Sequence, residues 1–105
     1  MDKKKNLIKN LTEFKRRVNN EIPINKMLLF GSQVKGKTHE WSDVDLIVVS
    51  KKFKGKRSFK RANKLYDFWF IDYPVDFLCY TPEEFERKKQ EHGIVREAVK
   101  KGIEV

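Results

Sequence analysis

The sequence predicts a mixed α/β (α+β) fold in which helices flank a small, mixed three-stranded sheet. Two observations carry this prediction: apolar residues recur at helical spacing near both ends of the chain, and three short apolar runs lie between them. With 105 residues, the chain is expected to form one domain, residues 1–105, around a single core.

Residues 3–20 are expected to form an amphipathic helix, because apolar side chains recur there at helical spacing while Lys and Arg fill the other faces. The apolar positions are Leu7, Ile8, Leu11, Phe14 and Val18. Met27–Phe30 is a continuous apolar run that predicts a buried strand. Gly31-Ser32 marks the end of that strand, and one helical turn is expected after Ser32.

Two further strands are expected later in the chain. The run Val44–Val49 is apolar on both faces apart from Asp45, which is typical of a central strand. A basic loop around Gly55 is expected to follow. The run Val75–Tyr80 predicts a third strand, with Asp76 near its start.

Helices are expected on either side of the third strand. The first has an apolar stripe that Pro74 ends, formed by Phe59, Ala62, Leu65, Tyr66 and Trp69. The second begins with a capping box, in which Thr81 is the N-cap and Glu84 its partner. Pro82 suits the first helical position. Gly102 is placed to end this last helix, and Gly93 interrupts it.

The charge balance favours polyanionic partners, since 24 Lys and Arg against 15 Asp and Glu give a net charge of +9. The basic run Lys51–Lys64 is interpreted as a solvated face. Cys79 is the single cysteine, so no internal disulfide forms, and its apolar surroundings predict a small core residue. No stretch has the length of a membrane span or a signal core, and a cytoplasmic location is expected.

Asp43 and Asp45 are the first candidate site residues. Side chains two apart on a strand project from the same face, so the two carboxylates point together where the second strand begins. Carboxylates this close repel one another, and a divalent cation relieves the repulsion. Because Mg²⁺ prefers oxygen ligands, the pair predicts a magnesium site.

Gly31, Ser32 and Asp76 extend this site. If the first two strands pair antiparallel, Gly31-Ser32 lies beside Asp43. Gly31 then permits close approach of a ligand, and Ser32 offers a hydroxyl and an amide proton to a phosphate. Asp76 is an acid inside an apolar run, and a third strand parallel to the second brings it to the same edge. Asp72 is a rival third acid, but it lies in an expected turn before Pro74.

Three carboxylates beside a phosphate-binding turn are typical of two-metal phosphoryl transfer. In this hypothesis Asp43 and Asp45 bind both Mg²⁺ ions. Asp76 binds the ion that activates the attacking hydroxyl, and it accepts the hydroxyl proton. All three acids are therefore candidate catalytic residues as well as metal ligands.

The pattern of Gly31-Ser32, ten further residues and then Asp43-Val44-Asp45 before an apolar strand resembles the signature of the DNA polymerase β nucleotidyltransferase superfamily. The length and the later strand bearing Asp76 are most similar to the minimal nucleotidyltransferases. This resemblance covers residues 5–102. It implies a nucleotidyltransferase fold and transfer of a nucleoside monophosphate, AMP from ATP, to a hydroxyl group. It also implies a helical HEPN-type partner, a toxin that the nucleotidyltransferase adenylylates as its antitoxin.

Several alternatives remain open. Gly31 to Thr38 fits the P-loop pattern G-x-x-x-x-G-K-[ST], but only four residues separate it from Asp43, which leaves no room for the long helix that a P-loop needs. The chain would otherwise be a non-catalytic module that neutralises a partner by contact, or a nucleic-acid binder that uses its net charge. The acceptor is expected on a partner chain or in an open cleft, and a homo-oligomer stays an open alternative.

Overall fold

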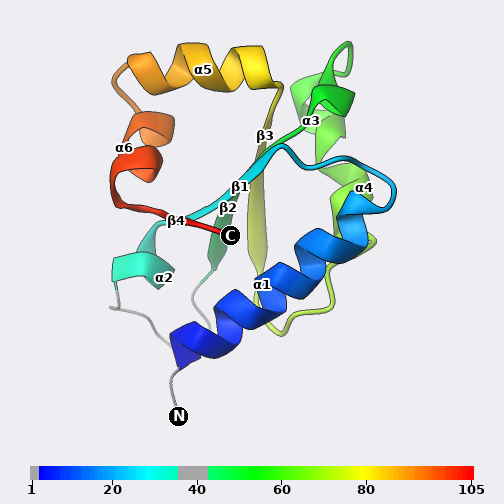
Figure 1. The fold of residues 1–105 in the computed structure, drawn as a ribbon, viewed down its shortest axis with the longest axis vertical. Coiled ribbons are helices and arrows are strands. Elements are labelled where there is room, and N and C mark those ends of the chain that lie inside the picture. Colours follow the sequence, from blue (N-terminus) through cyan, green and yellow to red (C-terminus); the bar gives the residue numbers. More distant parts are fainter. Residues whose placement is uncertain (1–2, 36–42) are drawn as a thin grey trace.

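Helix α1 (Lys3–Asn19) packs one apolar stripe against the sheet in this computed structural model, which describes residues 3–35 and 43–105. Its buried side chains follow helical spacing and are no more than 3% exposed: Leu7, Leu11, Phe14 and Val18. Figure 1 shows α1 crossing the sheet. The helix predicted over residues 3–20 is therefore confirmed to within one residue.

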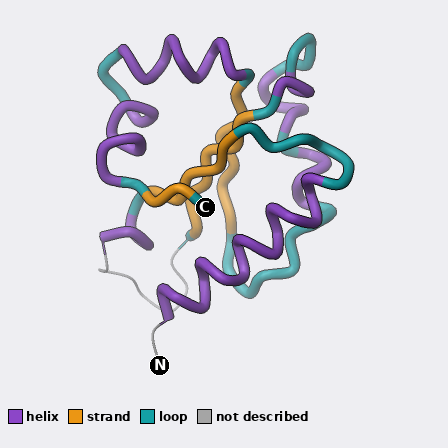
Figure 2. The backbone as a smooth tube through the Cα atoms, viewed as in Figure 1, coloured by secondary structure: helices purple, strands orange, loops and turns teal. Residues whose placement is uncertain are grey.

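The sheet has the strand order β3-β2-β1-β4. Strand β2 (Val44–Val49) is central, because it pairs antiparallel with β1 (Lys26–Phe30) and parallel with β3 (Val75–Tyr80). Strand β4 (Ile103–Glu104) pairs antiparallel with β1. Figure 2 shows the strands running together through the middle of the molecule, with helices on both sides.

The alternation of side chains along β2 divides the core between the two faces of the sheet. Val44, Leu46 and Val48 pack on the face that α1 covers, together with Leu65. On the other face the buried side chains are Leu28, Ile47, Val49, Phe85, Val95 and Ala98. Asp45 is the second residue of β2, and by the same alternation it lies on the face of Ile47 and Val49, at the start of the strand.

The outer edge of β3 is covered by the segment that follows β2. This segment contains a short 3-10 helix, η1 (Lys51–Phe53), and the helices α3 (Ser58–Arg61) and α4 (Asn63–Tyr66). Arg61 Nη1 donates to the carbonyl of Cys79 at 3.2 Å, and the Tyr66 hydroxyl donates to the carbonyl of Val75 at 3.4 Å. Two backbone acceptors of the edge strand are therefore already bonded to side chains.

Arg61 also binds the carboxylate of Glu84 through both terminal nitrogens, at 2.5 and 3.1 Å. Glu84 is part of the predicted capping box, which is present: Thr81 accepts from the Glu84 amide, and the Glu84 side chain accepts from the Thr81 amide. One carboxylate thus caps helix α5 (Pro82–Gln90) and fixes Arg61, whose side chain is 8% exposed. Because of this bond to Arg61, the pKa of Glu84 falls to about 2.

The structure differs from the predicted elements in three places. The mixed sheet flanked by helices is confirmed, but it has four strands, because the chain beyond Gly102 adds β4 alongside β1. The stripe predicted from Phe59 to Trp69 forms two four-residue helices, and Phe59 is 69% exposed because the buried Arg61 takes the inward position. The last helix is divided at Gly93, whose φ of 151° interrupts the backbone between α5 and α6 (Ile94–Lys101).

Gly102 ends α6 as predicted, but close packing rather than a left-handed conformation accounts for the glycine. Its φ is −80°. A Cβ at this position would overlap the carbonyl oxygen of Ala98 and lie 2.7 Å from that of Leu29. The absent side chain therefore lets the end of α6 pack against β1.

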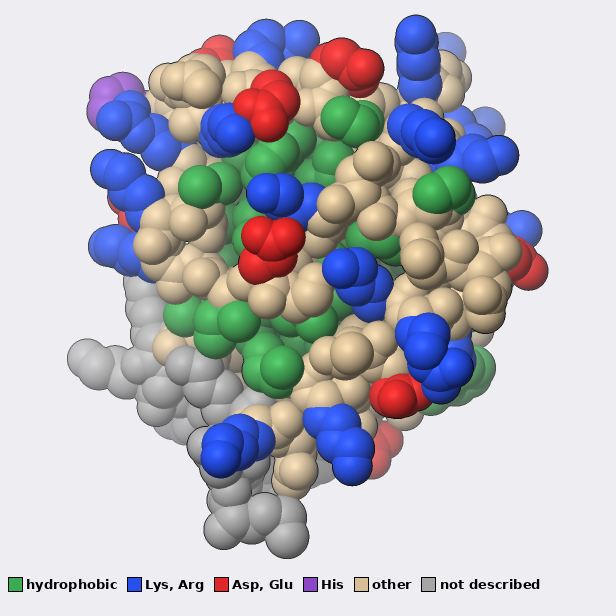
Figure 3. Space-filling view, in the orientation of Figure 1, with side chains coloured by type: hydrophobic (Ala, Val, Ile, Leu, Met, Phe, Trp, Pro, Cys, Tyr) green, Lys and Arg blue, Asp and Glu red, His purple; other side chains and the backbone are tan. Residues whose placement is uncertain are grey.

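Basic side chains are distributed over the surface. Figure 3 shows Lys and Arg around most of the visible face, with Asp and Glu between them and hydrophobic side chains toward the middle. Cys79 is 9% exposed, and burial raises the pKa of its thiol to about 12, which agrees with the predicted core role. Among the described residues, no helix is both long and apolar enough to cross a bilayer.

Candidate active site

Asp45 and Asp76 lie side by side at one edge of the sheet. Each is the second residue of its strand, and the parallel pairing of β2 with β3 places them in register. A backbone hydrogen bond of 2.8 Å from the Val44 amide to the Pro74 carbonyl joins the two strand starts. Asp45 is half-buried and Asp76 is exposed. The register therefore brings together two acids that are 31 residues apart in the sequence.

Asp43 directly precedes β2 and is exposed. It is near enough to Asp45 to act on it: burial raises the pKa of the Asp45 carboxyl above its ordinary value, and the charges of Asp76 and then Asp43 raise it further. Asp72 does not contribute to this effect, and it lies in an exposed bend before β3. The geometry thus gathers Asp43 and Asp76 around Asp45 and leaves Asp72 outside.

Gly31 completes this edge from the other side. The antiparallel pairing of β1 with β2 places Phe30 opposite Asp45, so Gly31 follows immediately at the end of β1. A Cβ on Gly31 would overlap Oδ2 of Asp45 and lie 3.3 Å from its Cγ. The φ of Gly31 is 83°, in the left-handed region that glycine adopts without strain. Both the backbone turn and the nearby carboxylate therefore require glycine.

Ser32 begins α2 (Ser32–Lys35), the single helical turn that was expected after β1. The amide of Val34 donates to the carbonyl of Gly31 at 3.1 Å, which closes this turn. The backbone of Ser32 therefore lies next to the residue that borders Asp45. The structure does not describe the Ser32 side chain, and its phosphate-binding hydroxyl stays a prediction.

The donor set of this edge suits a divalent cation, because its groups are carboxylate oxygens that repel one another and leave Asp45 with a raised pKa. However, no group of three or more His, Cys, Asp or Glu side chains within residues 3–35 and 43–105 stands close enough to hold a metal ion. The acids share an edge but do not form a closed ligand cluster. The metal ligands stay a prediction.

The strand pairing argues against the P-loop alternative. The strand before a P-loop is followed by a long helix and a crossover, whereas β1 pairs antiparallel with β2 along its whole length. Lys37 and Thr38 of the pattern lie outside the described residues. Gly31 thus takes part in the turn beside Asp45.

A cavity beside Gly31 was not anticipated from the sequence. It has a volume of about 550 Å³ and lies between α6 and the junction of β1 with α2. A signal was present in the pattern of small residues, Gly93, Ala98 and Gly102, around the i,i+4 pair of Glu97 and Lys101. That pattern places small residues at both ends and in the middle of the last helix, but it does not show what lies opposite them.

Comparison with known proteins gives two matches. The family model described as "Nucleotidyltransferase domain" matches residues 9–105. The second match is the crystal structure of a Sulfolobus solfataricus protein that is provisionally named a nucleotidyltransferase. The two sequences are 24% identical, and the TM-score is 0.67. The matched region covers 96% of this chain and 80% of the Sulfolobus solfataricus chain. At that identity the likeness shows the fold. The curated proteins include no match.

Proposed function

This chain belongs to the nucleotidyltransferase domain family, and from that premise we propose that it transfers AMP from ATP to the hydroxyl group of an acceptor. The observation that carries the proposal is the in-register pair Asp45 and Asp76, with Gly31 against the Asp45 carboxylate. Family membership supports a nucleoside triphosphate as substrate. The choice of ATP and of the acceptor goes beyond it.

In this proposal the carboxylates of Asp43, Asp45 and Asp76 would hold two Mg²⁺ ions, and they would have to draw closer together than they stand in this structure. Bound there, Mg²⁺ supplies positive charge that stabilises the phosphates and favours the deprotonated form of a hydroxyl. The raised pKa of Asp45 supports this assignment. Burial and the neighbouring carboxylates disfavour the ionised form of Asp45 in the free protein, and a bound cation would stabilise that form.

The protein side of the reaction follows from the exposure of Asp76. The acceptor hydroxyl oxygen attacks the α-phosphorus of ATP, the bond to the bridging oxygen breaks, and pyrophosphate leaves. The hydroxyl proton passes to the Asp76 carboxylate, which is exposed and therefore reachable from solvent. Gly31 and the amide and hydroxyl of Ser32 bind the phosphates on the other side of Asp45.

The acceptor that we propose is a hydroxyl group of an HEPN-type partner protein, which rests on the resemblance to minimal nucleotidyltransferases. The contact-only alternative predicts a different result for one variant. If the chain acts by transfer, a double variant with Asp43→Asn and Asp45→Asn leaves the partner active. If it acts by contact, the double variant inhibits the partner as well as the wild type does.

The test of nucleotide binding is a calorimetric titration of ATP into the protein, with and without Mg²⁺. We expect Mg²⁺-dependent binding that Asp43→Asn abolishes with little loss of fold. Asp72→Asn is the matched control, because Asp72 is, like Asp43, an exposed acid shortly before a strand, in this case β3. This variant should bind ATP normally. Binding that is indifferent to Asp43 would contradict the proposal.

A further inference from the structure

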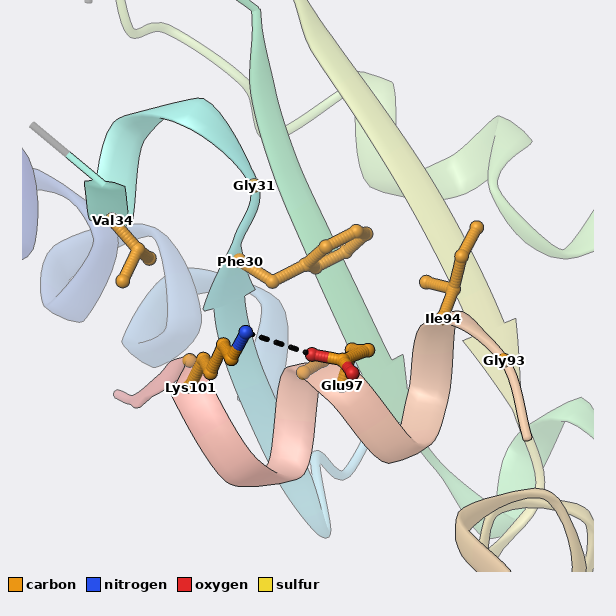
Figure 4. A pocket seen from close by; sticks show the side chains of 9 residues that line it. Phe30, Gly31, Val34, Gly93, Ile94, Glu97 and Lys101 are labelled. Carbon is orange, nitrogen blue, oxygen red and sulfur yellow. Dashed lines mark ion pairs between the residues drawn. The ribbon is translucent and has the colours of Figure 1, made fainter. Parts of the chain in front are cut away.

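The cavity next to Gly31 is mainly apolar and adjoins the edge that carries the acids. Phe30, Val34 and Ile94 supply apolar side chains from β1, α2 and α6, and Gly31 lies among them. Figure 4 shows Phe30 and Val34 on one side, with α6 opposite. The volume of about 550 Å³ falls within the range of sites for small organic ligands.

Gly31 is shared between this cavity and the acid edge. It lines the cavity, and its Cα faces the carboxylate of Asp45 so closely that a Cβ would overlap Oδ2. A ligand whose phosphates lie beside Asp45 therefore meets the cavity across a residue without a side chain. No bulky group of Gly31 separates the two regions.

Glu97 and Lys101 place an acceptor and a donor together at the cavity. They form an i,i+4 pair on α6 with Nζ and Oε2 3.5 Å apart, and their side chains are 63% and 71% exposed. Figure 4 shows the pair directed toward each other across one turn of α6. A pair this exposed gains little from its own contact, so both groups are available to a ligand.

We propose that this cavity holds the nucleoside of the triphosphate, a purine base with its ribose, an inference that rests on the function proposed above. The apolar side chains of Phe30, Val34 and Ile94 suit the faces of a flat aromatic base. Glu97 accepts a hydrogen bond from the exocyclic amine of adenine, and Lys101 donates one to the neighbouring ring nitrogen. The phosphates then extend past Gly31 to the acids.

Two pairs of variants on α6 test the site. Ile94 and Val99 are both exposed apolar residues, at 59% and 47%, but only Ile94 lines the cavity. Ile94→Trp fills the cavity, and Val99→Trp is its control. Lys101→Ala removes the donor, and its control is Lys100→Ala, one residue away and outside the lining.

Each variant is titrated with ATP and with inorganic tripolyphosphate, both with Mg²⁺. We expect Ile94→Trp and Lys101→Ala to weaken ATP binding by about tenfold, the size expected for loss of base contacts, and to leave tripolyphosphate binding unchanged. The controls should bind both ligands as the wild type does. Asp45→Asn should lose both ligands.

The outcomes separate the two proposals. If the wild type binds neither ATP nor tripolyphosphate, the proposed function fails. If the wild type binds both in an Asp45-dependent way, but Ile94→Trp and Lys101→Ala bind ATP as tightly as their controls, then the cavity is not the nucleoside site. Equal losses for ATP and tripolyphosphate in Ile94→Trp would also overturn it, because the cavity would then act on the phosphates.

Discussion

The Cα of Gly31 packs against the carboxylate of Asp45 so closely that any side chain at position 31 would overlap Oδ2. The antiparallel register of β1 with β2 creates this contact, because Phe30 faces Asp45 and the chain turns immediately afterwards. The same glycine has a φ of 83°. Gly31 therefore has two roles, in the backbone turn and in the contact with a candidate metal ligand. The contributions of these two roles to stability and to nucleotide binding can be separated by experiment.

Gly31→Ala should lose both stability and nucleotide binding. The matched control is Gly55→Ala, because Gly55 has a φ of 82° but no atom within 4 Å of an added Cβ. Both variants should lose about 1–2 kcal/mol of unfolding free energy from the left-handed backbone, measured by urea denaturation. Only Gly31→Ala should displace the Asp45 carboxylate and lose ATP binding. Normal binding by Gly31→Ala would show that this contact is not needed.

Asp45→Asn should stabilise the metal-free protein slightly, by about 0–1 kcal/mol, because it removes a half-buried charge that Asp76 and Asp43 repel. The measurement is the Tm with and without Mg²⁺. Added Mg²⁺ should raise the Tm of the wild type and leave that of Asp45→Asn unchanged, since a ligand stabilises only a state that binds it. An equal rise in both would place any bound Mg²⁺ elsewhere.

Glu84→Gln should destabilise the protein by about 2 kcal/mol at neutral pH, because it leaves the buried Arg61 without its charged partner, while Gln preserves the capping box. The pKa of Glu84 is about 2 in the folded state and 4.5 ordinarily. The ionised form therefore stabilises the fold fully above about pH 4.5, and this contribution is lost as the pH falls toward 2.

Urea denaturation of the wild type and of Glu84→Gln between pH 7 and pH 2 checks this prediction. The difference between their unfolding free energies should be constant near neutrality and shrink below pH 4.5. Glu86→Gln is the control on the same helix, because the Glu86 side chain is 62% exposed and its pair with Lys89 should contribute almost nothing. A pH-independent difference for Glu84→Gln would rule out the charge as its cause.

Cys79 should resist thiol reagents in the folded protein. The side chain is 9% exposed, and burial raises its thiol pKa to about 12, so almost no thiolate is present at pH 8. Reaction with a disulfide reagent should become fast only in denaturant. The rate is measured from the absorbance of the thiolate that the reagent releases. Rapid reaction in native buffer would mean that β3 opens readily beneath Arg61.

The elements that the sequence predicts best are those set by local pattern. The stripe of α1, the three apolar strands and the capping box of Thr81 and Glu84 each follow from residues a few positions apart. The family signature at Gly31-Ser32 and Asp43-Val44-Asp45 is local in the same sense. Family membership and the mixed sheet were therefore predictable.

What the sequence did not predict depends on contacts between distant segments. Arg61 faces inward because its guanidinium binds the Glu84 carboxylate and the Cys79 carbonyl. The periodicity of the sequence does not show that an arginine will take the interior position predicted for Phe59. Strand β4 exists because Gly102 lets the chain pass close to Leu29. The cavity depends on the same approach of α6 to β1.

The cover over the outer edge of β3 also limits the routes to Asp76. Arg61 and Tyr66 already occupy the carbonyls of Cys79 and Val75, so an extended segment of another protein cannot add to this strand without displacing them. We therefore expect that the acceptor of the proposed reaction reaches the exposed Asp76 in some other way than as a strand added to β3.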